Sequence, residues 1–204
     1  MYIPDLYKNK DKESIQKFLK ENAFGILINQ TNGKLWATHI PLELEINKEG
    51  EEVLHGHIAK ENPQSTAFQT NDQVLAVFTG PHSYISSSWY DHENVPTWNY
   101  SAVHVYGKIK IIKGDAVIDS LTKLVDKYEQ NSKCPVRVAD FSKKTMLQTR
   151  GIVAFEIKIE EIQAQNKMSQ NRDAKNYSNI ILELEKTENP QSIAVAKEMT
   201  KNKK

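Results

Sequence analysis

The sequence predicts a mainly β protein with flanking helices, in which about seven strands form an antiparallel barrel. Three observations predict this fold class. Most strand-like runs follow one another through short turns, helical segments are few, and an Asn32-Gly33 pair typical of a tight hairpin separates two of the runs. Regular alternation of strands with helices would instead have predicted a parallel, doubly wound sheet.

An amphipathic helix is expected to open the fold. Residues 11–22 place Ile15, Phe18 and Leu19 on one helical face. Four strand-like runs follow, over residues 23–29, 34–40, 42–46 and 52–58.

The middle of the chain predicts further strands and two helices. Asn62-Pro63 begins a short helix that runs to about Gln69, because proline is tolerated in a first helical turn. The expected strands then cover residues 73–79, 101–112 and 151–162. A helix over about 115–130 has one apolar side, made of Ile118, Leu121, Leu124, Val125 and Tyr128.

The composition becomes polar after residue 163, and apolar residues then return at helical spacing. Residues 1–163 are therefore assigned to the barrel domain and residues 164–204 to a C-terminal helical arm. A disordered tail is the alternative. The arm's apolar residues favour packing on the barrel or on a partner subunit: Ile180, Ile181, Leu182, Leu184, Ile193, Val195 and Met199.

Composition excludes several classes of function. The net charge is +1, from 27 basic and 26 acidic residues, so no global field attracts nucleic acid or a membrane surface. The longest apolar runs, such as residues 74–78, are too short to span a bilayer. The first residues lack the apolar core of a secretory signal, which predicts a cytoplasmic protein. A single cysteine, Cys134, excludes an internal disulfide and a cysteine-based metal cluster.

Three histidines lie close together in the predicted sheet. His55 and His57 share one face of a strand, and His39 lies on a nearby strand. Three histidines can bind zinc, but no acidic or cysteine ligand accompanies them at fixed spacing. Polar groups at a barrel mouth explain the pattern equally well, and no metal site is expected.

The segment HIAKENPQS, residues 57–65, has features of a phosphate site. Lys60 supplies a cation where a strand ends, and Asn62 precedes the expected helix start. Exposed N–H groups and the helix dipole favour an anion there. The segment lacks the glycine pattern of a P-loop or Rossmann turn.

Residues 80–100 contain five aromatic residues but show neither strand alternation nor helical spacing. They are Tyr84, Trp89, Tyr90, Trp98 and Tyr100. Three interpretations remain open: a loop packed by its own side chains, a wall for a flat ligand, and a subunit interface.

Five segments together resemble the PaiB family of FMN-binding negative transcriptional regulators. They are ATHIPLEL (37–44), GHIAKENPQ (56–64), FTGPHSYISSSWY (78–90), VPTWNYSAVHVYG (95–107) and KMSQNR (167–172). The resemblance implies an FMN-binding split barrel of the pyridoxamine-phosphate oxidase type, usually a homodimer.

The resemblance also implies a set of cofactor-binding residues. Lys60 and Asn62 are expected at the FMN phosphate, Thr38 and His39 as further donors, and the aromatic segment as an interface wall near the flavin ring. The whole expected set is Thr38, His39, His57, Lys60, Asn62, Tyr84, Trp98, Asn99, Ser169 and Gln170. No catalytic residue is assigned, although His39, His57 and His82 are candidates for acid–base chemistry.

Two classes of function follow from the resemblance. The first is a flavin-linked regulator or redox sensor. DNA binding is then implied by the family alone, since the sequence contains only three arginines and no helix-turn-helix pattern. The second is an FMN-dependent oxidoreductase that uses a nicotinamide donor. Haem binding, known for related split barrels, is a third and more distant possibility.

Overall fold

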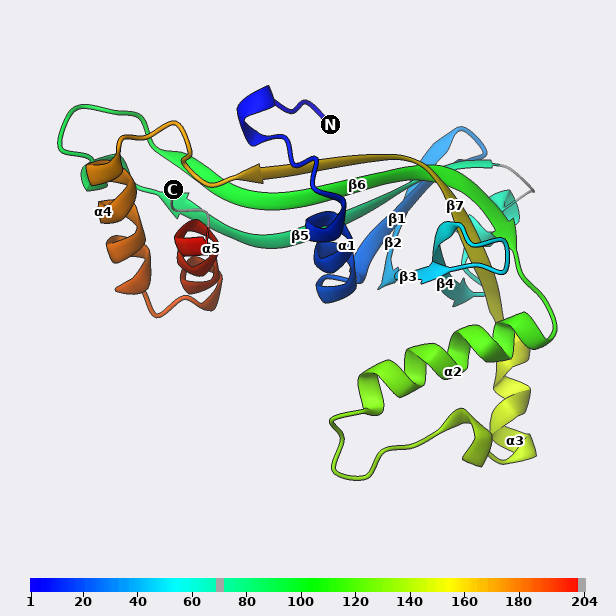
Figure 1. The fold of residues 1–204 in the computed structure, drawn as a ribbon. Coiled ribbons are helices and arrows are strands. Elements are labelled where there is room, and N and C mark those ends of the chain that lie inside the picture. The colour runs from blue at the N-terminus through cyan, green and yellow to red at the C-terminus, as the bar shows by residue number, and fades with distance from the viewer. Residues whose placement is uncertain (69–71, 202–204) are drawn as a thin grey trace. The chain divides into compact units, whose positions relative to one another are not determined.

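The computed structural model describes residues 1–68 and 72–201, and contains one seven-stranded sheet in the order β2-β1-β5-β6-β7-β4-β3 (Figure 1). The strands are β1 (Phe24–Thr31), β2 (Lys34–Pro41), β3 (Glu43–Ile46), β4 (Glu52–Ala59), β5 (Asp72–Ile85), β6 (Thr97–Ile111) and β7 (Ile152–Lys167). The sheet is antiparallel and carries flanking helices, so the predicted fold class is confirmed.

Five α-helices accompany the sheet within the described residues. They are α1 (Lys12–Glu21), α2 (Asp115–Glu129), α3 (Lys143–Met146), α4 (Ala174–Glu185) and α5 (Pro190–Lys201). Five short 3-10 helices connect other elements: η1 (Asp5–Tyr7), η2 (Pro63–Ala67), η3 (Ser87–Trp89), η4 (Val138–Asp140) and η5 (Leu147–Gly151). The end of the helix expected to reach Gln69 lies outside the described residues.

The hairpin of β1 and β2 forms where the sequence predicts it. Thr31 pairs with Lys34 across a two-residue turn, in which Asn32 and Gly33 have φ angles of 52° and 76°. These left-handed angles are those that asparagine and glycine tolerate best.

The chain divides into two compact units. The barrel unit comprises Leu19–Val77 and Val105–Ile162, and the arm unit comprises Met1–Phe18, Phe78–His104 and Gln163–Lys204. Strands β5, β6 and β7 each contribute residues to both units.

The barrel unit has an apolar core between curled strands. Strand β2 lies near β4 as well as beside β1, as a barrel-like curl of the sheet requires. Phe68 and Phe155 meet edge to face at 5.2 Å inside it. The other large buried side chains include Leu27, Leu42, Leu54, Ile109 and Ile157.

Within the barrel unit, ion pairs join helix α2 to strand β3. Lys127 contacts Glu43 at 2.6 Å and Lys123 contacts Glu45 at 2.7 Å. The Tyr128 hydroxyl also donates to Glu43, at 3.0 Å. Burial and the Glu43 carboxylate together raise the pKa of Tyr128 to about 12. The helix covers the predicted range, but none of its residues is fully buried.

The arm unit has a second core, in which α4 and α5 pack against each other and against the β5–β6 connection. Its buried side chains include Ile85, Tyr90, Met168, Ile180, Leu184, Val195 and Met199. Of the apolar residues predicted in the C-terminal segment, Ile180, Ile181, Leu184, Val195 and Met199 are buried in this core, Ile193 is partly buried and Leu182 is exposed.

The aromatic segment is more regular than the sequence indicates. Strand β5 continues to Ile85 and β6 begins at Thr97, so only the residues between them connect the strands. The buried positions here include Gly80, Ser83 and Asn99, with Ile85 as an apolar one. Small and polar residues at buried positions remove the hydrophobic alternation by which a strand is predicted.

Among the described residues, none of the helices has both the length and the apolar character needed to cross a membrane.

We predict that Gly107→Ala destabilises the protein. A Cβ atom at Gly107 in β6 would lie 2.2 Å from the Lys158 carbonyl oxygen and 2.8 Å from Ile157 in β7. Strand backbone must then move, so the free energy of unfolding should fall by about 1–3 kcal/mol. Urea denaturation measures this change.

Gly151→Ala is the matched control, because a Cβ atom there meets nothing within 4 Å. Equal stability of the two variants would contradict the close packing of β6 on β7.

Candidate functional site

A polar cluster lies between β2 and η2 in the barrel unit. The Thr38 hydroxyl donates to Gln64 Oε1 and accepts a hydrogen bond of 2.9 Å from Asn62 Nδ2. Gln64 is fully buried, and its amide nitrogen donates to the Leu27 carbonyl at 3.1 Å. The cluster therefore fixes the turn after β4 against the β1–β2 hairpin.

Lys60 lies in that turn with an exposed side chain. Its backbone N–H donates to the Gly151 carbonyl at 2.8 Å, and Asn62 N–H closes the turn onto the Ala59 carbonyl at 3.0 Å. Within the described chain, the Lys60 ammonium forms no ion pair. The turn holds the Lys60 backbone in place, and the exposed ammonium is available to an anion.

The helix dipole contributes less to anion binding at the start of η2 than the sequence suggests. η2 is a 3-10 helix of five residues, Pro63 has no N–H, and the Gln64 N–H is capped by the Asn62 side chain at 3.0 Å. An anion here would depend on Lys60 and on side-chain donors, because the helix start offers few free N–H groups.

Neither His39 nor His57 belongs to this cluster. His39 adjoins Thr38 in β2, so the two side chains point to opposite faces, and His39 is exposed. His57 lines a cavity of only about 10 Å³ beneath α2. Burial lowers the pKa of His57, which favours the neutral form of its imidazole.

The inner face of the hairpin holds buried polar groups that the sequence analysis missed. Both amide atoms of Asn29 and the hydroxyl of Thr31 have no hydrogen-bond partner among the described residues. Asn29 pairs with Trp36 and Leu27 pairs with Thr38, so these side chains share one face. The alternate spacing of Leu27, Asn29 and Thr31 was the available signal, but polar residues at such positions are also common on exposed faces.

Three aromatic rings form an exposed patch in the arm unit. Trp98 lies 6.1 Å from Tyr84 in an edge-to-face arrangement and 6.2 Å from His82, measured between ring centroids. Trp98 and Tyr84 are 53% and 46% exposed. We call these three residues the aromatic patch.

Asn99 and Ser169 come together as a buried pair. Asn99 Nδ2 donates to the Ser169 hydroxyl at 2.9 Å, and that hydroxyl lies 3.1 Å from Asn99 Oδ1. Ser169 has a left-handed φ of 59°, which turns the chain sharply after β7. Both side chains satisfy each other, so their role is to hold this turn.

A cavity of about 690 Å³ lies in the arm unit, between residues 6–14 and 166–177. Gln170 lines it, but both ends of the Gln170 amide are bonded to the backbone, at Met168 N and Asn166 O. Arg172 also lines it and was not predicted as a site residue. We call this the arm cavity.

The histidines form no metal centre in the part of the chain that the structure describes, where no three His, Cys, Asp or Glu side chains gather closely enough. His55 instead contacts Glu156 at 3.2 Å.

The chain matches a known family and a known protein over most of its length. The profile of the family described as "Putative FMN-binding domain" matches residues 1–161. The PaiB protein of Bacillus subtilis (strain 168), named "Protease synthase and sporulation protein PAI 2", is 44% identical over 200 residues, which cover 98% of this chain and 96% of the relative. The chain belongs to the PaiB family of FMN-binding domains. The resemblance predicted from the sequence motifs is confirmed.

Solved structures support the fold. The FAD- and haem-binding protein of Mycobacterium smegmatis has a TM-score of 0.63 at 16% identity, covering 84% of this chain and 78% of that one. The flavocytochrome Anf3 of Azotobacter vinelandii has a TM-score of 0.62 at 16% identity, covering 84% and 75%. Together with the PaiB-family match, they identify the sheet as a flavin-binding split barrel.

The residues present fit FMN, the cofactor of the PaiB family. Lys60 is an unpaired cation suited to a phosphate, and the orphaned amide of Asn29 offers both a donor and an acceptor. Bound FMN supplies electron transfer, and the protein supplies its binding and electrostatic environment.

Proposed function

We propose that this chain is a flavin-linked regulator that works as a homodimer and holds the FMN phosphate at Lys60. The observation that carries the proposal is a lysine fixed at the end of β4, without an ion-pair partner in the described chain, beside the Thr38–Asn62–Gln64 cluster. Asn62 Nδ2 retains a second hydrogen for the same phosphate.

The remaining site residues take supporting roles in this proposal. Tyr84 and Trp98 are proposed as rings for the flavin in the dimer, and Asn99 with Ser169 holds the turn that follows β7. His39, His57 and Gln170 complete the proposed set, with His57 acting as a neutral group. Steady oxidation of NADH or NADPH by the FMN-loaded protein would instead identify an oxidoreductase.

We predict that Lys60→Ala weakens FMN binding by about tenfold to a hundredfold, because a hydrogen bond to a charged group is lost. Quenching of flavin fluorescence on titration measures the affinity. The barrel should remain folded, since the Lys60 side chain is exposed.

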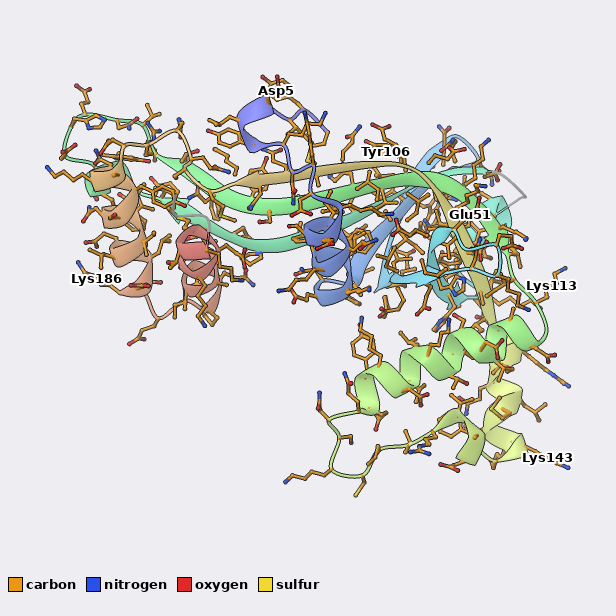
Figure 2. All side chains as sticks on the ribbon, viewed as in Figure 1. Asp5, Glu51, Tyr106, Lys113, Lys143 and Lys186 are labelled. Carbon is orange, nitrogen blue, oxygen red and sulfur yellow. The ribbon has the colours of Figure 1, made fainter. Side chains whose placement is uncertain are left out.

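Lys113→Ala is the matched control. Lys113 projects into solvent between β6 and α2 (Figure 2). Equal FMN affinities for the two variants would remove Lys60 from the phosphate site.

The aromatic patch is the surface proposed to bind a second copy of the chain. Two large rings half exposed side by side are unusual on a monomer surface, and Val95 between β5 and β6 is 70% exposed. Aromatic residues are enriched in subunit interfaces. A wall at the interface would also place rings beside a flavin.

We predict that Trp98→Glu converts the dimer to a monomer, because it places a carboxylate in the centre of the apolar contact. Light scattering at micromolar concentration measures the molar mass. Leu35→Glu is the control, since Leu35 is 72% exposed on β2, outside the patch. A monomeric wild-type protein would refute the proposed dimer.

We expect the protein itself to have a low affinity for DNA. Lys123 and Lys127 on α2 are already paired with glutamates. With a net charge of +1, few phosphates can be neutralised at once.

We therefore predict DNA binding that is salt-sensitive and indifferent to sequence. Fluorescence anisotropy at near-physiological salt compares a promoter fragment with scrambled DNA. Nanomolar affinity for the promoter alone would show that the dimer builds a specific DNA-binding surface.

The cytoplasm is the proposed location. Cys134 is exposed and free, as suits a reducing compartment. Cell fractionation tests this assignment.

A further inference from the structure

We propose that the arm cavity is a separate effector site for a small organic anion, with Arg172 binding its carboxylate or phosphate and the cavity wall holding an apolar body. This goes beyond FMN binding at Lys60, since the residues that line the cavity all belong to the arm unit and none belongs to the Lys60 cluster. Gln170 is the lining residue that the proposed FMN set shares, and both ends of its amide are already bonded to the backbone. Its volume of about 690 Å³ is that of a small-molecule site.

The charges that line the cavity are unbalanced. Arg172 and Lys8 line it, and neither forms an ion pair with any described residue. Asp11 is the carboxylate that lines it, and it is used to cap α1, accepting the Glu13 and Ser14 N–H groups at 3.0 and 3.3 Å. The cavity therefore has an excess of positive charge, which an anion would neutralise.

Arg172 is held in place rather than free in solvent. Its guanidinium carbon lies 5.0 Å from the ring centroid of Tyr90, which belongs to the arm core. Its Nε is buried and has no hydrogen-bond partner in the described residues. A buried N–H without a partner is costly, and a fixed guanidinium loses little entropy on binding an anion.

A second cation strengthens the argument. Burial lowers the pKa of Lys167, and the positive charge of Arg172 lowers it further. The Lys167 ammonium donates to the Thr97 hydroxyl and has no carboxylate partner in the described chain. Two cations in this neighbourhood repel each other, so an anion bound at Arg172 would relieve that repulsion.

Part of the remaining cavity wall is apolar and lies beside the polar residues Asn9, Ser14 and Asn166. The apolar part favours an organic body over a bare inorganic ion. Leu6, Tyr7 and Tyr177 line it. The Tyr177 hydroxyl is already donated to the Met199 carbonyl at 2.8 Å, and the Gln170 amide is bonded at both ends. Apolar surface and satisfied polar groups suit the ring or chain of an organic acid.

The test uses the full-length, FMN-loaded protein and two probes, phenyl phosphate and inorganic phosphate. Isothermal titration calorimetry measures their affinities, and flavin absorbance after gel filtration measures FMN retention. We expect phenyl phosphate to bind at least about tenfold more tightly than inorganic phosphate, because only the former fills the apolar part. Equal affinities would overturn the proposal.

Two variants test the charge and the space separately. Arg172→Gln should weaken phenyl phosphate by about tenfold to a hundredfold. Ala174→Trp, which keeps every charge but adds bulk at the cavity wall, should abolish binding of phenyl phosphate. Arg150→Gln is the control for loss of an arginine, because Arg150 does not line the cavity, and should leave the affinity unchanged.

FMN retention separates this proposal from the flavin site. We expect both cavity variants to retain FMN as the wild-type protein does. Circular dichroism checks that the variants are folded. If folded cavity variants lose both FMN and the binding of phenyl phosphate, the cavity is part of the flavin site and the proposal is overturned. Loss of FMN in Lys60→Ala with unchanged phenyl phosphate affinity would support two separate sites.

Discussion

The rest of the structure depends on the continued backbone pairing of three long strands. Strands β5, β6 and β7 contain 14, 15 and 16 residues, and each supplies residues to both the barrel unit and the arm unit. Hydrogen bonding along a ladder determines which residues share a face of the sheet. In β5 the buried positions change phase between Gly80 and Ser83, close to the point where the strand passes from the barrel unit to the arm unit. Each long strand therefore supplies residues to two different interiors.

The inward residues change in character along these strands. In the barrel unit they are apolar, as at Ala76, Ile109 and Phe155. In the arm unit they include Ser83, Asn99 and Ser101, which form hydrogen bonds with Ser192, Ser169 and Asn166. The first interior gains stability from apolar burial, whereas the second is held by specific polar pairs and by the α4–α5 core. Polar pairs fix positions sharply, which suits a region that carries the arm cavity.

This change explains what could be predicted from the sequence. The barrel strands and α2 were predicted because their buried residues are apolar and recur at the strand or helix period. The ends of β5 and β6 were missed because Gly80, Ser83 and Asn99 occupy buried positions without a hydrophobic signal. Lys60 and Asn62 were predicted from a motif, whereas Gln64, Asn29 and Arg172 depend on contacts between distant parts of the chain. Such contacts leave no local pattern.

The two proposed anion sites differ in the burial and the mobility of their cation, Lys60 or Arg172. This difference determines which kind of ligand each site suits. Lys60 is an exposed, compact ammonium in a turn, so its attraction for a phosphate is screened by salt and depends on help from neighbouring donors. Arg172 is half-buried and stacked on Tyr90, where its charge is screened less and its planar donors are already oriented. A cofactor that stays bound can draw on many contacts, so one modest electrostatic contact suffices. A small effector that must bind and leave makes few contacts with the protein. A preorganised arginine can supply much of its binding energy through a single contact.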